Sequence, residues 1–200
     1  SSGVCIKPRT INFHVMLLRV SMIFESELWK KSLLNTADNL ERRYNQKRWS
    51  ARSIFLLERD LFLGFFSVRK LIESNVVSDK IKGKSVLLAV YPVKGKGVIL
   101  LNQHRFAEFY DLYAGQKESL SYHEICNQFI HSAIYSPFIP CGSSLVGIFV
   151  SSDYKKKKKL FYIPLVKVVE IMRCVGSNQL KKLKVTFDEK NKEYVVKSAI

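Results

Sequence analysis

Two long stretches in the first half of the chain repeat apolar residues at helical spacing. Between Phe24 and about Ser50, apolar side chains recur every three to five residues among Glu, Lys, Arg and Asn. A second, more apolar stretch runs from Ala51 to Ser74, and its stripe consists of Ile54, Leu57, Leu61, Phe65, Val68 and Ile72. Spacings of three and four residues are typical of amphipathic helices. We therefore predict two helices, the second of which lies at the centre of a helical bundle.

Shorter apolar runs follow. The segments Val86–Tyr91 and Val98–Leu101 flank a turn rich in Pro, Gly and Lys, which predicts a β-hairpin inserted between helices. A short helix is expected from Arg105 to Tyr113. Another helix is expected to be capped by Ser119 or Ser121 and to run to about Ser136, because the next residue is a proline, which disfavours helix continuation.

The last quarter of the chain favours strands. Leu145–Val150 and Leu160–Leu165 predict two strands, and Val185–Phe187 with Tyr194–Lys197 predict a closing hairpin. Between them, Val166–Val175 is compatible with a strand or a helix, and the helix is favoured because its apolar and charged positions separate onto two faces. The expected tail is a small antiparallel sheet.

These elements predict an α+β fold: a helical bundle with an inserted β-hairpin, followed by a small antiparallel β-sheet. The length of 200 residues fits one domain or slightly more. The expected divisions are an N-terminal extension over residues 1–23, a bundle over 24–144 with its hairpin at 85–102, and a basic antiparallel β region over 145–200.

Charge narrows the choice of partners. The chain has 33 Lys and Arg against 17 Asp and Glu, a formal net charge of +16, which favours nucleic acid or an acidic protein. Five consecutive lysines predict a cationic loop that contacts phosphates, although such a run also occurs as plain solvated surface. The predicted nucleic-acid-binding residues are Tyr154, Lys155, Lys156, Lys157, Lys158 and Lys159, and RNA is favoured over DNA.

The cysteines and the hydropathy pattern indicate a compartment. The four cysteines are far apart, with no Cys-x-x-C pair and no His at metal-ligand spacing, so we expect reduced thiols in a cytoplasmic protein and no metal. No run approaches the ~20 apolar residues that cross a bilayer, so no membrane partner is expected. The chain has none of the common hydrolase motifs or phosphate-binding loops, and no cofactor is expected.

Three polar residues stand out against the apolar pattern. On a helical wheel Glu58 falls inside the stripe of the 51–74 helix, where an ionised carboxylate needs a basic or hydrogen-bonding partner from another element. A purely structural pairing with an Arg would also satisfy it. Asn127 and His131 are four residues apart, so they are neighbours on a helix surface, at the edge of an apolar face. A histidine at such an edge also occurs as an ordinary structural residue.

Two central helices followed by a helix with Asn-x-x-x-His resemble the HEPN superfamily, helical bundles of bacterial defence and toxin systems. Nucleases of that family carry Arg-x(4 to 6)-His, with a polar residue after the Arg. In this chain the segment from Cys126 to His131 fits the spacing, but Cys126 replaces the Arg. The family's Arg holds the phosphate while its His transfers protons at the 2′-hydroxyl. The resemblance therefore implies a degenerate, non-cleaving member in which Glu58 faces Asn127 and His131.

Three functions follow as hypotheses. The leading one is a non-catalytic, basic bacterial protein that contacts nucleic acid, in a defence or mobile-element system. The second is a metal-independent HEPN-like ribonuclease, with His131, Asn127 and Glu58 as catalytic residues. The third is an interaction or immunity protein that binds an acidic protein partner. A homodimer formed through the helical bundle is compatible with each of them.

Overall fold

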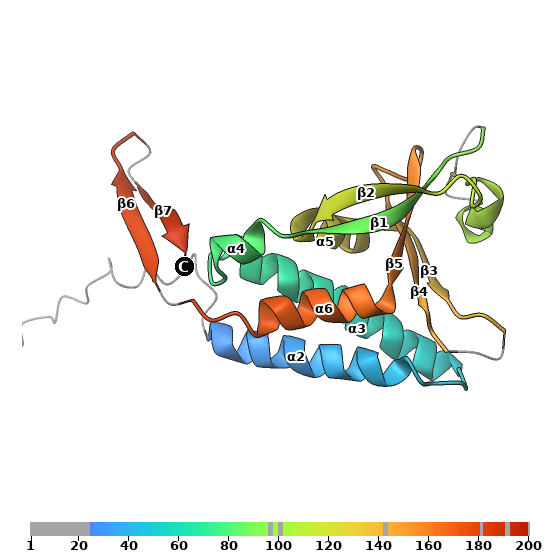
Figure 1. Cartoon of the computed structure of the whole chain (residues 1–200), viewed down its shortest axis with the longest axis horizontal. Coiled ribbons are helices and arrows are strands. Elements are labelled where there is room, and N and C mark those ends of the chain that lie inside the picture. Colours follow the sequence, from blue (N-terminus) through green and yellow to red (C-terminus); the bar gives the residue numbers. More distant parts are fainter. Residues whose placement is uncertain are drawn as a thin grey trace, which may run out of the picture.

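The computed structural model describes residues 25–95, 98–99, 102–141, 144–180, 182–190 and 193–199. The predicted N-terminal extension, residues 1–23, lies outside this part. The described chain is α+β, with helices packed against one face of a five-stranded antiparallel sheet and a separate two-stranded hairpin (Figure 1). The helices are α2 (Ser26–Arg43), α3 (Ala51–Glu73), α4 (Asp79–Lys82), α5 (Tyr122–Ile130), α6 (Leu165–Gly176) and the 3₁₀ helix η1 (Gln103–Glu108). The strands are β1 (Ser85–Pro92), β2 (Gln116–Ser121), β3 (Ser132–Phe138), β4 (Gly147–Ser152), β5 (Lys159–Pro164), β6 (Leu183–Asp188) and β7 (Glu193–Ala199).

The two long helices confirm the first prediction. Helix α3 begins with a capping box, in which the Ser50 side chain accepts from the backbone N–H of Ser53 and the Ser53 side chain accepts from the N–H of Ser50. Every member of its predicted stripe from Leu57 onward is buried. The stripe packs against α2, α5 and α6, so α3 is the central helix.

The buried face of α3 is rotated by roughly 30° from the predicted one, at 100° per residue. Gly64, Leu71 and Asp60 are buried as well, and they widen the face on one side. Asp60 therefore takes the buried acidic position, whereas Glu58 is exposed. The expectation that Glu58 lies inside the apolar stripe is wrong.

The inserted hairpin is also wrong. Strand β1 is part of the five-stranded sheet, whose order is β2-β1-β5-β4-β3. Its register pairs Ser85 with Ser121 on β2 and Ala89 with Tyr162 on β5. Of the predicted second strand, residues 98 and 99 are described and lie outside any strand. A central strand needs partners on both edges for its backbone N–H and C=O groups, and here both partners come from distant segments.

Helix α5 is shorter than predicted. It ends at Ile130, and the segment predicted as its last turn and a half forms strand β3. Strand β3 lies at the edge of the sheet and pairs with β4 on one side only. Pro137 is tolerated there because an edge strand can lack one backbone N–H without breaking a ladder. The proline thus marks an edge strand, not a helix stop.

The tail divides into two parts. Strands β4 and β5 join the large sheet, while β6 and β7 form the predicted closing hairpin by themselves. Helix α6 is confirmed. Hydrogen bonds tie the hairpin and the segment before it to the start of α4. The backbone N–H of Ala199 donates to Asp79 Oδ2 at 2.8 Å, the N–H of Ser78 donates to Asn178 Oδ1 at 2.8 Å, and Asn178 Nδ2 donates to Ser78 Oγ at 3.2 Å.

The main core lies between the helices and the inner face of the sheet. Phe65 of α3 stacks on Phe129 of α5 with ring centroids 4.0 Å apart. A second, smaller cluster covers part of the outer face, where Tyr110 is buried with Leu160 and Ile134. Burial raises the pKa of the Tyr110 hydroxyl, which donates to the backbone carbonyl of Lys156. No helix in the described part of the chain is both long and apolar enough to cross a bilayer.

Candidate functional site

A pocket of about 330 Å³ opens where α3, α5 and the β4–β5 turn meet. Arg69 reaches it from α3, Asn127 and His131 from α5 and its C-terminal cap, and Tyr154 and Lys155 from the turn. The remaining lining residues are Glu118, Leu120, Glu124, Gln128, Ser152 and Phe161. Members of the predicted catalytic set and of the predicted nucleic-acid-binding set therefore share one pocket.

Arg69 is the central cation of the pocket. Its Nη1 donates to Asn127 Oδ1 at 2.7 Å and lies 3.4 Å from His131 Nε2. Its Nε donates to Glu73 Oε1 at 2.7 Å. The side chain is still 27% exposed. Three neighbours thus fix the direction of the guanidinium while part of it faces solvent.

The contacts of Arg69 extend into a polar network between α3 and α5. Glu73 Oε1 lies 3.3 Å from His123 Nε2, and His123 Nδ1 lies 3.5 Å from Asn127 Nδ2. The hydrogen bond from Arg69, followed by that from His123, lowers the pKa of Glu73 below its ordinary value. Glu73 is therefore ionised at neutral pH and balances part of the positive charge of Arg69.

Helix α5 also holds the turn that carries the lysines. The backbone carbonyl of His131 accepts from the N–H of Asp153 at 2.8 Å, and Gln128 Oε1 accepts from the N–H of Ser152 at 3.1 Å. These two bonds place the start of the turn beside the end of the helix. His131 itself is exposed, so its ring is accessible from the pocket.

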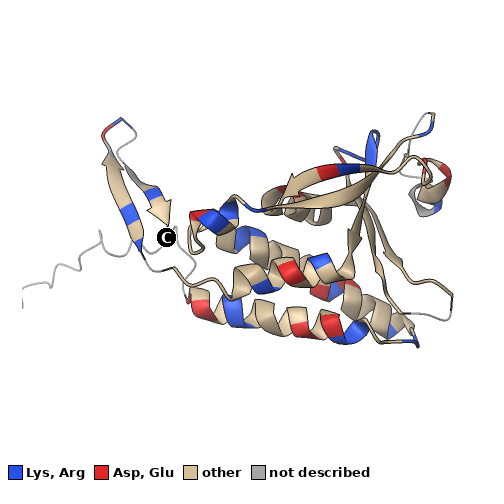
Figure 2. Ribbon diagram, in the orientation of Figure 1, with Lys and Arg blue, Asp and Glu red and all other residues tan. Residues whose placement is uncertain are grey.

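We call residues 155–159 the lysine turn. It forms part of the β4–β5 turn and ends at Lys159, the first residue of β5 (Figure 2). Not all five side chains are free of intramolecular contacts. Lys156 Nζ donates to Asp153 Oδ1 at 2.5 Å, and Lys159 forms an ion pair with Glu118. The ammonium groups of Lys155 and Lys158 lie 5.7 and 6.0 Å from the centroid of the Tyr154 ring. The predicted loop of five projecting lysines is therefore correct only in part.

The aromatic residues near the lysines differ in exposure. Phe161 is buried and Tyr162 faces the other side of the sheet, as strand alternation predicts. Tyr154 is 79% exposed. Of these three rings, only Tyr154 presents a large open surface next to cationic groups.

Glu58 does not reach this site. It is exposed on α3, does not line the pocket, and its described electrostatic neighbour is Tyr135, whose pKa is raised first by burial and then by Glu58. The sequence prediction missed Arg69, which lies eleven residues after Glu58. Eleven residues are about three helical turns, so both residues lie along the same edge of α3. The sequence pattern placed Glu58 inside the apolar stripe and gave no sign that Arg69 is the partner of Asn127 and His131.

Cys126, the residue that the expected resemblance aligned with an Arg, is fully buried. Burial raises the pKa of its thiol, which stays protonated at neutral pH. Arg69 supplies a guanidinium next to His131 from a different helix. Among the described residues, no three His, Cys, Asp or Glu side chains are grouped so as to hold a metal ion.

No family model, curated protein or solved structure matches the chain.

Proposed function

We propose that the protein binds single-stranded RNA at this pocket without cleaving it. The observation that carries the proposal is the meeting of Arg69, His131, Lys155 and Tyr154 in one pocket of about 330 Å³. The volume lies at the lower end of the ~300–1,000 Å³ typical of small-ligand sites, which suits a single nucleotide unit. Single-stranded RNA offers both a phosphate and an unstacked base at each step.

Arg69 and Lys155 are the phosphate-binding groups in this proposal. The two acidic residues of the pocket wall already have partners: Glu118 is paired with Lys159, and Glu124 accepts from the backbone and side chain of Ser121. Arg69 has an exposed portion, and the guanidinium is well suited to phosphate oxygens. Tyr154 supplies an exposed ring on which a base can stack.

The test is an anisotropy titration of a fluorescent RNA oligonucleotide at several salt concentrations. We expect Arg69→Ala to weaken binding about tenfold, the loss of one charge-assisted contact. Serine at 155, 157 and 158 should weaken binding further and flatten its salt dependence, by roughly one unit of slope for each lost phosphate contact. These three lysines are chosen because Lys156 and Lys159 have acidic partners.

A matched control removes the same charge elsewhere. Lys31, Lys47 and Lys80 are exposed and lie on or beside α2 and α4, away from the pocket. Their replacement by serine should change affinity only slightly. Equal losses in the control and in the lysine-turn variant would show that net charge, not this pocket, determines binding.

The 3.4 Å distance between Arg69 Nη1 and His131 Nε2 also favours a second candidate, a metal-independent ribonuclease. His131 would accept the proton of the 2′-hydroxyl as that oxygen attacks phosphorus and the 5′-oxygen leaves with a proton from solvent. Arg69, oriented by Asn127, would stabilise the charge on the phosphate. RNA cleavage that survives EDTA and is lost in His131→Ala would support this candidate, and equal cleavage by that variant would end it.

A further inference from the structure

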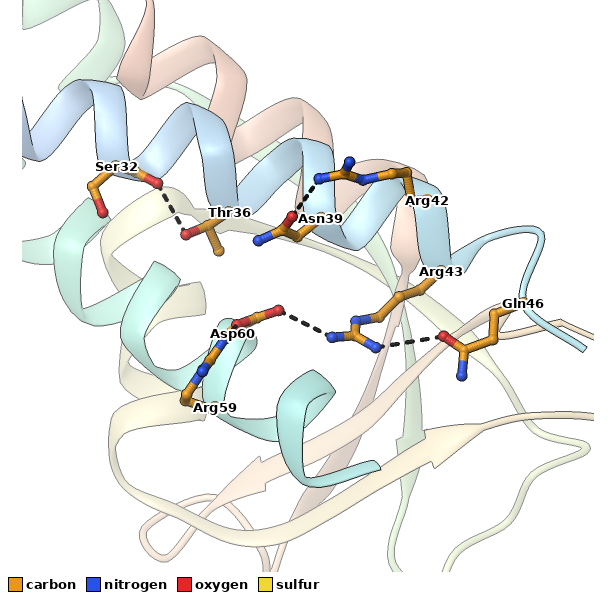
Figure 3. A network of polar contacts seen from close by, with 8 residues as sticks. All are labelled: Ser32, Thr36, Asn39, Arg42, Arg43, Gln46, Arg59 and Asp60. Carbon is orange, nitrogen blue, oxygen red and sulfur yellow. Dashed lines mark hydrogen bonds and ion pairs between the residues drawn. The ribbon is translucent and has the colours of Figure 1, made fainter. Parts of the chain in front are cut away.

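A second pocket, of about 360 Å³, lies between the end of α2 and the first half of α3 (Figure 3). Three arginines line it: Arg42 and Arg43 from the last turn of α2, and Arg59 from α3. The other lining residues are Asn39, Gln46, Leu56 and Asp60. None of these residues belongs to the pocket around Arg69, and the predicted functional residues are likewise absent from it.

Asp60 sets the positions of two of the arginines. Its Oδ2 lies 3.3 Å from Arg43 Nη2, and its Oδ1 accepts from Arg59 Nη2 at 2.7 Å and from Arg59 Nε at 3.1 Å. The side chains of Asp60 and Arg43 are 6% and 12% exposed, whereas Arg59 is largely open. The site is therefore anchored by a buried ion pair and opens toward solvent at Arg59.

Charges and hydrogen-bond donors both exceed their partners in this pocket. The lining residues include three guanidiniums and one carboxylate, an excess of two positive charges. Asp60 already accepts from Arg43 and Arg59, and Arg42 Nη2 donates to Asn39 Oδ1 at 2.5 Å. Arg43 Nε is buried and has no acceptor among the described residues. A guanidinium carries five N–H donors, so several remain for a ligand.

We call the pocket lined by Arg42, Arg43 and Arg59 the arginine pocket, and we infer that it binds a phosphate monoester. A dianionic phosphate matches the excess of two positive charges, and its oxygens match the N–H donors that remain on the exposed guanidiniums of Arg42 and Arg59. The pocket volume is at the lower end of the ~300–1,000 Å³ typical of small-ligand sites, enough for a phosphate with a small attached group. This site goes beyond the proposed RNA-binding pocket, because it uses other elements and none of the same residues.

The first experiment is an isothermal titration with inorganic phosphate. We expect Arg59→Ala and Arg42→Ala each to weaken binding about tenfold, since each removes one charge-assisted contact. Both side chains are on the open side of the pocket, and circular dichroism checks that the helices are intact. The matched control is Arg52→Ala, an exposed arginine two turns earlier on α3 that does not line the pocket, and it should bind phosphate like the wild type. Absence of binding by the wild type, or equal affinity in all four proteins, overturns the inference.

A second arm distinguishes the source of the phosphate. An RNA oligonucleotide with a 5′-phosphate is compared with the same oligonucleotide ending in a 5′-hydroxyl. A preference for the phosphorylated oligonucleotide that disappears in Arg59→Ala identifies a nucleic-acid end as the source. Binding of inorganic phosphate together with equal affinity for the two oligonucleotides identifies a small phosphorylated molecule instead. Arg69→Ala should keep its phosphate affinity in either case, so failure of the RNA-binding proposal leaves this result unaffected. Loss of phosphate binding in Arg69→Ala overturns the separation of the two sites.

Discussion

Two polar clusters lie on the same helix, nine residues or roughly 13 Å apart, and they differ in depth. At Asp60 a carboxylate that is 6% exposed faces Arg43, whose side chain is nearly as buried. At Arg69 a cation that is 27% exposed faces the Asn127 amide, the Glu73 carboxylate and the His131 ring. A buried ion pair cannot lose one member without leaving a charge in the core, whereas a half-open cluster can exchange its partners for water or a ligand. The depth of each cluster therefore predicts its contribution to stability, which is larger for the buried Asp60–Arg43 pair than for Arg69. Binding is proposed for the exposed guanidiniums of both clusters, Arg59 and Arg69.

The largest effect is expected at the buried cluster. Asp60→Ala leaves the charge of Arg43 without its partner in the core, which should lower the free energy of unfolding by about 3–5 kcal/mol. Urea denaturation measures the loss. The matched control is Glu58→Ala, an exposed acidic residue two positions earlier, which should change the same quantity by less than about 0.5 kcal/mol. Equal losses of unfolding free energy in Asp60→Ala and Glu58→Ala would contradict the expectation that the buried Asp60 stabilises the protein more than the exposed Glu58.

A smaller loss is expected midway between the clusters, where α3 passes α6 at Gly64. A Cβ at this position would lie 2.3 Å from Met172 Cε and 3.0 Å from its Sδ. Gly64→Ala should destabilise the protein by about 1–3 kcal/mol, because the flexible methionine yields only in part and the better helix propensity of Ala offsets some of the clash. Gly83→Ala is the control, since its Cβ would meet only a backbone oxygen of Asp79 at 3.5 Å. Thermal melts measure both variants: a lower melting temperature for Gly64→Ala than for Gly83→Ala supports the prediction, and equal melting temperatures contradict it.

At the half-open cluster the stability effect should be smaller still. Arg69→Ala removes hydrogen bonds to Asn127 and Glu73, which should cost about 1 kcal/mol of unfolding free energy. Its RNA affinity should nevertheless fall about tenfold, as proposed above. A loss of stability as large as that of Asp60→Ala would show that Arg69 contributes as much to stability as the buried ion pair does.

The smallest effect concerns acid pH. The pKa of Glu73 is lowered by Arg69 and His123, so its contribution to stability is present above the ordinary carboxyl pKa and is lost as pH falls through the lowered value. Because Glu73 is largely exposed, solvent screening limits this contribution to about 0.5 kcal/mol or less. Unfolding free energies measured between pH 5 and 3 should fall less steeply in Arg69→Ala than in the wild type. An equal dependence of the unfolding free energy on pH in the two proteins would show that Arg69 does not lower the pKa of Glu73.

The helices could be predicted because their signal is local. The apolar spacing of α2, α3 and α6 lies within each segment, so three helices follow from the sequence alone. The sheet could not be predicted in the same way. The partners of β1 begin about 30 and 75 residues away, at β2 and β5, and no local pattern specifies which edges will meet. The end of α5 was missed for a related reason: the apolar positions of β3 also fit a helical wheel, and only pairing with β4 decides between them.

The site was predicted in part for the same reason. Asn127 and His131 are recognisable as an i, i+4 pair, and the lysine turn is visible as a run of one residue type. Arg69 carries no such signal, since a single arginine on an amphipathic helix is ordinary. Arg69 meets Asn127, which is 58 residues away in the sequence, only because α3 packs against α5.

The position of β5 has a consequence for synthesis of the chain. It is the last strand of the large sheet to be made, and it lies between β1 and β4. Until β5 leaves the ribosome, β1 and β4 each lack one neighbouring strand, so one edge of each is open to pairing with another nascent chain. The lysines that precede β5 suit this situation, because charge next to an inserting strand discourages pairing with the wrong chain.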